Sequence, residues 1–436
     1  MSKLKTQKLG SLSTTVASAF YPAATQLYEV GDTPFVRCVD CIEYPIITTA
    51  QDSKFEKIPL DFAKSNKGIS FIKTNEIVIT KVGTPCFASI IYDYDELALS
   101  RTVLGLTDIH DVDPYYLMTF LRCKYGFTQL LRQRELTIQY QLTLPRVKSV
   151  NIFISSPAFQ KRIKEICVKY LETISQAEKV YKQTEKLLYE HLGGFIGVES
   201  TGFIVKTFSD SFMQSGRLDA EYYQKKYDAL FDTLTGFSTA SLGGENGLVS
   251  IKKSIEPGSE AYQDEGIPFV RVSDVNKYGI DEPAIRLPHT IVPDVESLYP
   301  HKDTLLLSKD GSVGIAYKMK EDMQIVTSGA LLHLTVKDKN RILPDYLTLV
   351  INSQVVQLQA ERDCNGAIIQ HWKPSDIEKV LIPILDMGTQ KEISDKVQES
   401  FRLRAEAKQL LDNAIKAVEM AIETDEDAAL LWLELQ

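Results

Sequence analysis

The feature that most constrains this chain of 436 residues is an ordered internal repeat. The string PFVR at 34–37 returns at 268–271, and the stretch 100–107 matches 328–335. The offset between partners drifts only from 234 to 228 residues, and further matches keep the same order. Because this period is far longer than a solenoid unit, the sequence predicts a duplicated module of about 155 residues.

Each module has a mixed pattern of strands and helices. Short apolar runs of strand type at 77–79 and 305–307 are followed by helical stretches that open near 113 and 343. Each copy ends in a final strand, at 150–154 and 380–385. Strands come first and helices later, separated by Gly, Pro and Asn/Asp turns, which predicts an α+β fold.

A long helix is predicted after each module, at 157–192 and 389–423. Ser155 and Ser156 offer N-cap oxygens before Pro157, the only Pro of the first segment. Both segments carry a narrow apolar stripe on a charged background, made of Ile163, Ile166, Tyr170, Ile174, Ala177, Tyr181, Leu188 and Leu192, and of Ile393, Val397, Phe401, Ala407, Leu411, Ala414, Val418 and Ala421. Such stripes predict coiled-coil packing. The sequence therefore predicts two long antiparallel spacer helices with pseudo-two-fold symmetry, each spanning roughly 50 Å.

These patterns divide the chain into six parts. Gly193 and Gly194 end the first long helix, a short hairpin is expected over 195–212, and 217–223 opens a helix toward 234. The acidic and apolar tail is either a cap folded back on the helices or a docking peptide. The predicted boundaries are 1–155 and 236–388 for the modules, 156–192 and 389–423 for the helices, 193–235 for a connector and 424–436 for the tail.

Composition narrows the classes of function. Six Cys in so long a chain predict no disulfide framework and fit a reducing cytosol, and the lone C-x-x-C of Cys38 and Cys41 lacks a second pair at zinc spacing. No run of 18 apolar residues occurs, which favours a cytoplasmic protein. The net charge of −9 is unfavourable for nucleic-acid binding unless Lys and Arg cluster. Phosphate-loop, amino-methyltransferase and H-E-x-x-H motifs are absent from the sequence, so we expect a chain that binds and does not catalyse.

Several repeated motifs resemble one known family. Ile-Gln pairs at 138–139 and 369–370 precede the final strand of each copy, and Gln-Lys pairs at 160–161 and 390–391 open the long helices. Together with RLDAEYY at 217–223 and SKDGSVG at 308–314, this order is similar to that of the specificity (S) subunits of type I restriction-modification systems. The first copy departs from the pattern, since Leu144 and Pro145 precede its last strand and Cys86 replaces the second loop glycine.

The resemblance implies a non-catalytic subunit for phage defence. Each module would be a target-recognition domain that reads one half of a bipartite double-stranded DNA site. The helices would set the gap and dock two methyltransferase (M) subunits, to which motor-nuclease (R) subunits can add. No cofactor is expected in this chain, because S-adenosylmethionine would bind the partner methyltransferase. Partner subunits that enclose the duplex would also supply much of the phosphate neutralisation.

Candidate DNA-contacting residues lie at equivalent places in the two copies. Base reading needs donors and acceptors with fixed geometry on rigidly held loops. Lys81 and Thr84 match Lys309 and Ser312 beside loop glycines, although a tight turn with a solvated Lys gives the same pattern. Gln139 and Tyr140 are assigned to the positions of Gln370 and His371, with Lys373 following; packing against the spacer is the alternative role.

The remaining candidates are arginines. Arg37 and Arg271 occupy the same place in both copies, which favours a structural or backbone-directed role over base reading. Arg101 faces Gly329 in the alignment and is therefore a candidate for the first half-site only. Arg132 and Arg134 form a basic patch beside Tyr140, or simply a solvated helix face.

Three other interpretations remain open at this stage. A specificity-like subunit of another phage-defence methyltransferase would have the same sequence features. A two-module protein-interaction scaffold is favoured by the acidic pI of about 5.4. An enzyme with an unrecognised site is the least supported, since the duplicated polar residues do not resemble a nucleophile and base set.

Overall fold

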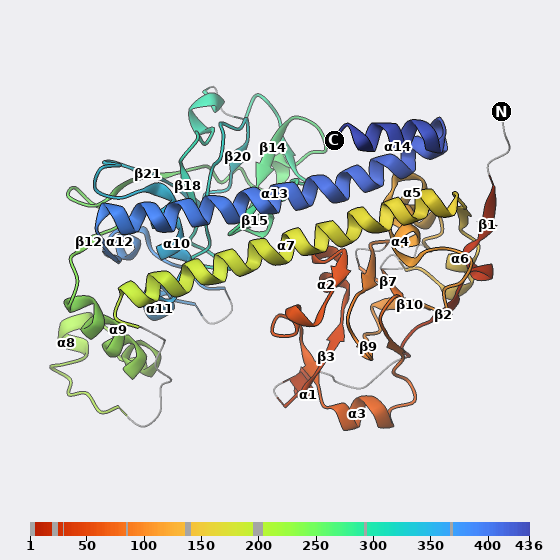
Figure 1. The fold of residues 1–436 in the computed structure, drawn as a ribbon. Helices are drawn as coiled ribbons and strands as arrows, with labels where there is room; N and C mark the ends of the chain where they lie inside the picture. The colour runs from red at the N-terminus through yellow and green to blue at the C-terminus, as the bar shows by residue number, and fades with distance from the viewer. Residues whose placement is uncertain are drawn as a thin grey trace. The chain divides into compact units, whose positions relative to one another are not determined.

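The computed structural model describes residues 5–19, 25–28, 30–83, 86–135, 141–194, 204–291, 294–366 and 369–436. The chain forms two compact units. Unit 1 consists of Met1–Ser175 and Arg404–Gln436, and unit 2 consists of Gln176–Leu403. Each unit contains one β-rich module with parts of both long helices (Figure 1). Within the described ranges, no helix is long and apolar enough to cross a membrane.

Unit 1 is built on two main sheets and a short strand pair. The five-stranded sheet has the order β2 (Thr14–Val16), β10 (Val103–Thr107), β7 (Ile77–Thr80), β8 (Ala88–Ile91) and β4 (Ile46–Ile47). The four-stranded sheet has the order β5 (Lys57–Ile58), β3 (Thr33–Val36), β9 (Leu97–Leu99) and β6 (Phe71–Ile72). The pair joins β1 (Thr6–Lys8) to β11 (Asn151–Phe153). The helices are α1 (Thr25–Tyr28), α2 (Cys38–Glu43), α3 (Leu60–Ser65), α4 (Pro114–Arg122), α5 (Lys124–Arg132) and α6 (Leu144–Lys148).

Unit 2 is also built on two main sheets, with different strand pairs beside them. Its larger sheet has the order β13 (Val249–Lys253), β21 (Leu331–Val336), β18 (Leu305–Ser308) and β19 (Ala316–Lys318), and its smaller sheet has the order β17 (Arg286–Leu287), β14 (Ile267–Val270) and β20 (Val326–Thr327). Two strand pairs join β12 (Thr239–Ser241) to β22 (Leu381–Pro383) and β15 (Val275–Asn276) to β16 (Gly279–Ile280). The module helices are α10 (Pro344–Asn352), α11 (Gln354–Asp363) and α12 (Pro374–Ile377).

The predicted duplication is confirmed by strand pairing and by single hydrogen bonds. β3 pairs antiparallel with β5 and parallel with β9, as β14 does with β17 and β20. Tyr116 donates its hydroxyl to the Phe153 carbonyl at 2.8 Å, and Tyr346 donates to the Pro383 carbonyl at 2.9 Å. These phenols fasten α4 and α10 to the final strand of their modules, so both copies satisfy the same buried polar groups in the same way.

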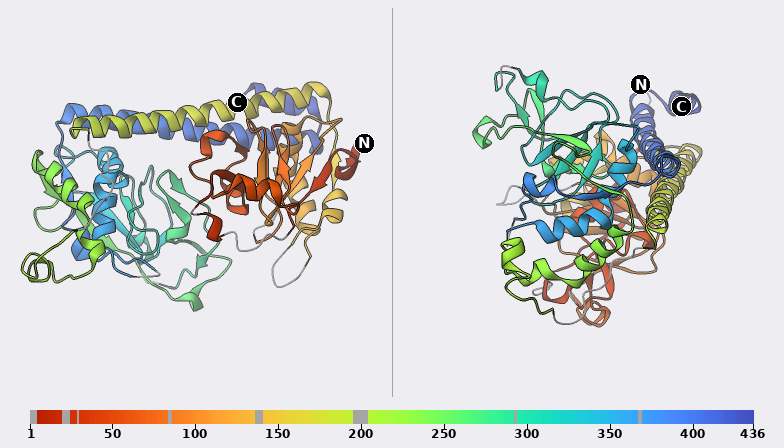
Figure 2. Two further views of the ribbon diagram at one scale, coloured as in Figure 1. Left: turned by 90° about the horizontal axis from the view of Figure 1, so that it is seen from below. Right: turned by 90° about the vertical axis from the view of Figure 1, so that its left-hand side faces the viewer.

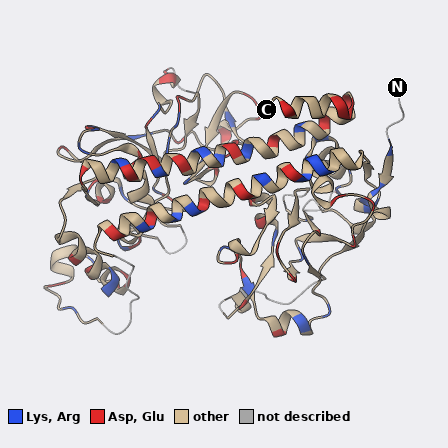
Figure 3. Ribbon diagram, in the orientation of Figure 1, with Lys and Arg blue, Asp and Glu red and all other residues tan. Residues whose placement is uncertain are grey.

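The long helices α7 (Pro157–His191) and α13 (Met387–Glu423) pack through the predicted stripes. All stripe residues are buried except Tyr170, Ile174 and Phe401, which are partly buried. In unit 1 the N-terminal part of α7 shares a core with Ala414 to Ala421 of α13, and in unit 2 the C-terminal part of α7 shares a core with Ile393 and Val397. The pair is therefore antiparallel (Figures 1 and 2). Acidic and basic residues alternate along both helices (Figure 3).

The tail forms a helix, α14 (Glu426–Glu434), that packs into the unit 1 core. Ala429 and Leu433 are buried, and Lys416 of α13 lies 4.9 Å from the centre of the Trp432 ring. The Ser156 backbone N–H donates to Glu426 at 2.9 Å, which ties the tail to the start of α7. These contacts are those of a cap folded back on the helices.

The connector differs from its prediction. Residues 195–203 lie outside the described part of the chain, and 204–211 contain no strand, so the second arm of the expected hairpin is wrong. The helix expected from 217 begins only at Lys225, because Ala220–Tyr223 form a 3-10 turn first. This part of unit 2 holds α8 (Phe212–Ser215) and α9 (Lys225–Thr235). Arg362 of α11 lies 5.2 Å from the Tyr222 ring centre and 4.3 Å from that of Phe231, which fixes the connector on the module.

Candidate nucleic-acid interface

A closed loop follows strand β18 in unit 2. The Ser308 hydroxyl donates to the Ser312 carbonyl at 2.5 Å and accepts from the Ile315 N–H at 2.9 Å, which pinches the loop shut. Gly311 and Gly314 have φ angles of 73° and 85°, which residues with a side chain rarely adopt. Lys309 and Ser312 therefore stand on a backbone of fixed shape, as a reading loop requires.

Strand β7 of unit 1 ends in the same loop. Thr80 takes the place of Ser308, since its hydroxyl accepts from the Phe87 N–H at 2.9 Å. Cys86 donates its N–H to the Thr80 carbonyl at 3.0 Å and has φ of 85°, the angle found at Gly314. The predicted replacement of a loop glycine by Cys86 is thus confirmed. Thr84, a predicted contact residue, lies outside the described residues.

A second segment of each module lies beside this loop. In unit 2, His371 pairs with Asp310 and Asn365 in strand-like bridges, and Trp372 donates its N–H to the Lys309 carbonyl at 2.8 Å. In unit 1, Gln141 pairs with Val82 and Glu135, and Leu142 donates its N–H to the Lys81 carbonyl at 3.0 Å. The two clusters therefore share one backbone arrangement.

This pairing corrects the alignment of the two copies. Gln141 occupies the position of His371, so the assignment of Gln139 and Tyr140 to Gln370 and His371 is wrong by one residue. The repeated Ile-Gln pair misled the alignment, because backbone pairing with Val82 and Asp310, and not local sequence identity, sets the register. Gln139 and Tyr140 themselves lie outside the described residues.

The unit 2 cluster carries an ionic chain. The Lys309 ammonium contacts the Asp310 carboxylate, whose other oxygen lies 2.9 Å from His371 Nδ1. Burial alone would raise the pKa of the Asp310 carboxyl, but hydrogen bonds and charge from Lys309 and His371 outweigh it and lower that pKa. The side chains of Ser312, Gln370, His371 and Lys373 are exposed around this chain. Asp310 was not predicted as a site residue; its signal was a carboxylate next to Lys309 where the first copy has Val82.

The unit 1 cluster is less polar at the same place. Val82 and Gln141 occupy the positions of Asp310 and His371, and no ion pair joins Lys81 to a described residue. Burial lowers the pKa of the Lys81 ammonium. The partly buried Lys81 is therefore a cation held at the loop without the carboxylate neighbour that Lys309 has.

Two of the predicted arginines, Arg101 and Arg134, are next in sequence to residues that bond to the unit 1 loop cluster. Lys81 donates its N–H to the carbonyl of Thr102, the neighbour of Arg101, while Lys309 donates to Ala330, the neighbour of Gly329. The alignment of Arg101 with Gly329 is thus confirmed, and the Arg101 side chain is exposed. Arg134 precedes Glu135, which pairs with Gln141, and Arg132 is exposed at the end of α5.

Arg37 and Arg271 belong to a different part of the modules. Each donates its backbone N–H to a carboxylate three residues on, Arg37 to Asp40 at 2.7 Å and Arg271 to Asp274 at 2.8 Å. The guanidinium groups lie 3.5 Å and 3.7 Å from the same carboxylates, and Arg37 also lies 3.3 Å from Glu56. These groups stabilise the short helical turn that follows β3 and β14.

The two cysteines of the C-x-x-C motif lie at the start and in the middle of α2. Cys41 is fully buried, and burial raises the pKa of its thiol. Across the described ranges, no group of three or more His, Cys, Asp and Glu side chains could hold a metal ion.

Fold and loops together define a class: a duplicated β-rich module on paired long helices, with one polar loop cluster in each copy. The family model for the type I restriction modification DNA specificity domain matches residues 246–417, which include most of the second module and much of α13. This match confirms the resemblance found in the sequence. Residues 246–417 thus match a DNA specificity domain of type I restriction-modification systems, and the first module repeats the strand order of the second.

The chain was also compared with curated proteins and with solved structures. Comparison with curated proteins gives no match. Among solved structures, the chain is similar to the type I restriction-modification S subunit from M. genitalium, with 13% identity, a TM-score of 0.42, and coverage of 95% of this chain and 96% of that chain. It is also similar to the HsdS subunit from Thermoanaerobacter tengcongensis, with 14% identity, a TM-score of 0.30 and coverage of 95% and 97%.

Proposed function

We propose that this chain is the non-catalytic specificity subunit of a type I restriction-modification complex, in which each module reads one half of a bipartite DNA site. The observation that carries the proposal is the family match over residues 246–417 together with the repetition of that domain's topology and loop cluster in unit 1. Two copies of one scaffold with different side chains suit a site whose halves differ in sequence.

Within each module, the loop cluster supplies the base-reading groups. In unit 1 these are Lys81, Arg101 and Arg134, with Thr84, Gln139 and Tyr140 on adjoining segments. In unit 2 they are Lys309, Ser312, Gln370, His371 and Lys373. Lys and Arg donate to guanine O6 and N7, and Gln can pair with adenine. Arg37 and Arg271 stabilise the modules and contact the phosphate backbone at most.

The long helices set the gap between half-sites and dock two methyltransferase subunits, to which motor-nuclease subunits add. The alternating charges along α7 and α13 support this role, since a polar helix surface suits a partner that is acquired after folding. S-adenosylmethionine binds the partner methyltransferase, in the cytoplasm. The net charge of −9 is compatible because partner subunits that enclose the duplex neutralise much of its phosphate charge.

The test is a pull-down of the intact chain from its native cells, followed by an assay of S-adenosylmethionine-dependent DNA methylation and mapping of the modified bases. We expect methylation at a two-part site with a fixed gap. A methyltransferase without any restriction subunit would assign the chain to another phage-defence system. An eluate without methyltransferase and without DNA affinity would contradict the proposal and favour the protein scaffold.

A further inference from the structure

The β15–β16 hairpin of unit 2 reaches the long helices. Asn276 pairs with Gly279, so Lys277 and Tyr278 are the two loop residues, and the Tyr278 N–H donates to the Asn276 side chain at 2.9 Å, which fixes the turn. The Tyr278 ring lies 5.4 Å from the Tyr181 ring of α7 at an interplanar angle of 79°. It lies 6.3 Å from the Phe401 ring of α13 at 62°. One side chain of the module thus contacts both helices.

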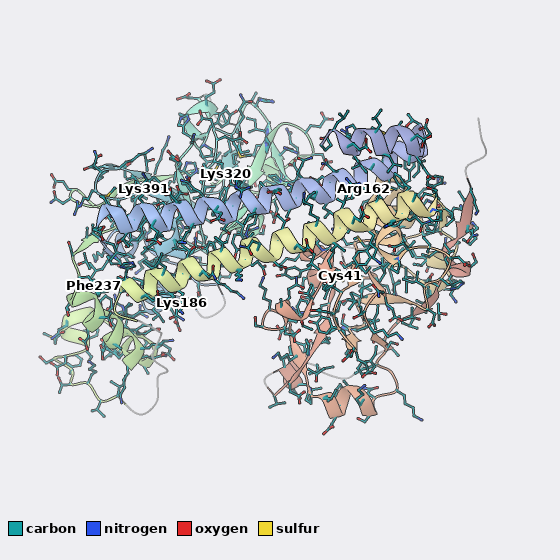
Figure 4. All side chains as sticks on the ribbon, in the orientation of Figure 1. Cys41, Arg162, Lys186, Phe237, Lys320 and Lys391 are labelled. Carbon is teal, nitrogen blue, oxygen red and sulfur yellow. The ribbon has the colours of Figure 1, made fainter. Side chains whose placement is uncertain are left out.

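Charged groups surround this aromatic contact. The Lys277 ammonium lies 4.5 Å from the Tyr181 ring centre and 3.7 Å from Glu185 of α7. On the other side, Lys320 lies 5.0 Å from the Phe401 ring centre, and Figure 4 shows Lys320 beside α13. Burial raises the pKa of the Glu185 carboxyl, and the charge of Lys277 opposes that rise. Ring faces and cations therefore hold the hairpin on the helix pair from both sides.

The matching part of unit 1 is built differently. Tyr44 stands at the equivalent offset from Arg37, but its ring packs on Phe55 of its own module at 6.1 Å. Val39 and Ile42 of α2, which replaces the hairpin, are 56% and 38% exposed. The core cluster around Val36 and Cys41 contains no residue of α7 or α13, whereas the corresponding cluster around Val270 and Val275 includes Phe401.

We propose that Tyr278 is a positioning residue that fixes the second recognition domain on its helices and thereby makes the DNA gap selective. The inference rests on the proposed function. A module held to the helices only at its base can rock about that base, whereas a second contact at the hairpin removes this freedom. Because reading groups must stay in register with the bases, rocking would allow half-sites at neighbouring spacings to bind.

The experiment measures DNA affinity of the complete complex for its mapped site with the gap at its native length and one base pair longer or shorter. Variants are Tyr278→Ala, the ring-preserving Tyr278→Phe, and Tyr44→Ala as the matched control in unit 1. For Tyr278→Ala we expect the preference for the native gap to fall by about tenfold, with both half-site sequences unchanged. Tyr278→Phe and Tyr44→Ala should keep the wild-type preference.

Unchanged gap preference in Tyr278→Ala, or an equal loss of affinity at all three gaps, would overturn the inference. If Tyr278→Ala does not fold, Lys277→Gln is the second variant. It removes the ion pair with Glu185 and the cation contacts with the Tyr181 and Tyr278 rings, and it should also weaken the preference. Unchanged preference in that variant overturns the inference too. Failure of the proposed function looks different, since the wild-type complex would then bind no bipartite site at any gap.

Discussion

The loop clusters of the two units share a backbone and differ in charge. In both, the backbone carbonyl of the strand-end Lys accepts a hydrogen bond from an N–H of the second segment. In both, a Ser or Thr hydroxyl accepts a backbone N–H that closes the loop. In unit 2, Asp310 ties Lys309 to His371, whereas in unit 1 Val82 and Gln141 leave Lys81 without a carboxylate at that place. The comparison teaches that the two copies keep the groups that hold the scaffold, while the polar side chains of the loop cluster differ.

The shared scaffold predicts that the two modules respond alike to core damage. Trp372 is 1% exposed and Leu142, its counterpart, is fully buried. We expect Trp372→Ala to lower the free energy of unfolding by ~3–5 kcal/mol and Leu142→Ala by ~2–5 kcal/mol, because each leaves a cavity beside its loop. Denaturant unfolding followed by hydrogen exchange would measure both. If only one of the two variants lost stability, the scaffolds would not be equivalent.

Acid should lower the stability of unit 2 more than that of unit 1. His333 of β21 is buried beside Thr327, and burial, assisted by Lys252, lowers its pKa to about 4, whereas Gly105 holds the matching place in unit 1. The unfolded chain binds a proton near pH 6.5 that folded His333 does not, so unit 2 loses stability as pH falls from about 6.5 to 4, by roughly 3 kcal/mol at most. His333→Gln should flatten this dependence, and His289→Gln, at an exposed site, should not.

Removal of each loop lysine should affect a different half-site. We expect Lys81→Ala and Lys309→Ala to cost ~1–3 kcal/mol of DNA binding if each reads a guanine. Selection from random DNA by the complete complex would locate the relaxed base in the first half for one variant and in the second half for the other. Asp310→Ala should change only the half read by Lys309, because it frees that ammonium. Equal relaxation of both halves in any of these variants would contradict separate reading.

The smallest expected effect concerns the positive-φ position of the two loops. Gly314→Ala should destabilise unit 2 by ~1–2 kcal/mol, because its φ is 85° and an added Cβ would lie 2.8 Å from the Gln357 side chain. Cys86→Gly relieves the same backbone strain but removes a buried thiol, so its net change should stay within about 1 kcal/mol. Thermal unfolding would compare them. A strongly destabilised Cys86→Gly would show that the thiol packing dominates.

The sequence predicted the parts of the fold that depend on periodicity and repetition. The duplicated strings located β7, β18, β11 and β22, and the apolar stripes located α7 and α13 to within two residues of their ends. The register at Gln141 and the tether of Lys309 through Asp310 to His371 were missed. Both depend on pairing between segments about 60 residues apart, which local pattern does not report. The Tyr278 contact escaped for the same reason, since it joins a hairpin to two distant helices.

The most direct test of independent half-site reading is an exchange of modules. In this variant, Thr6–Phe153 replaces Thr239–Pro383, the bounds of the equivalent strands, while α7 and α13 stay intact. The mapped methylation site of the assembled complex should then contain two copies of the first half-site. A site that still contains the second half-site, or an assembled complex that binds no bipartite DNA, would contradict the account.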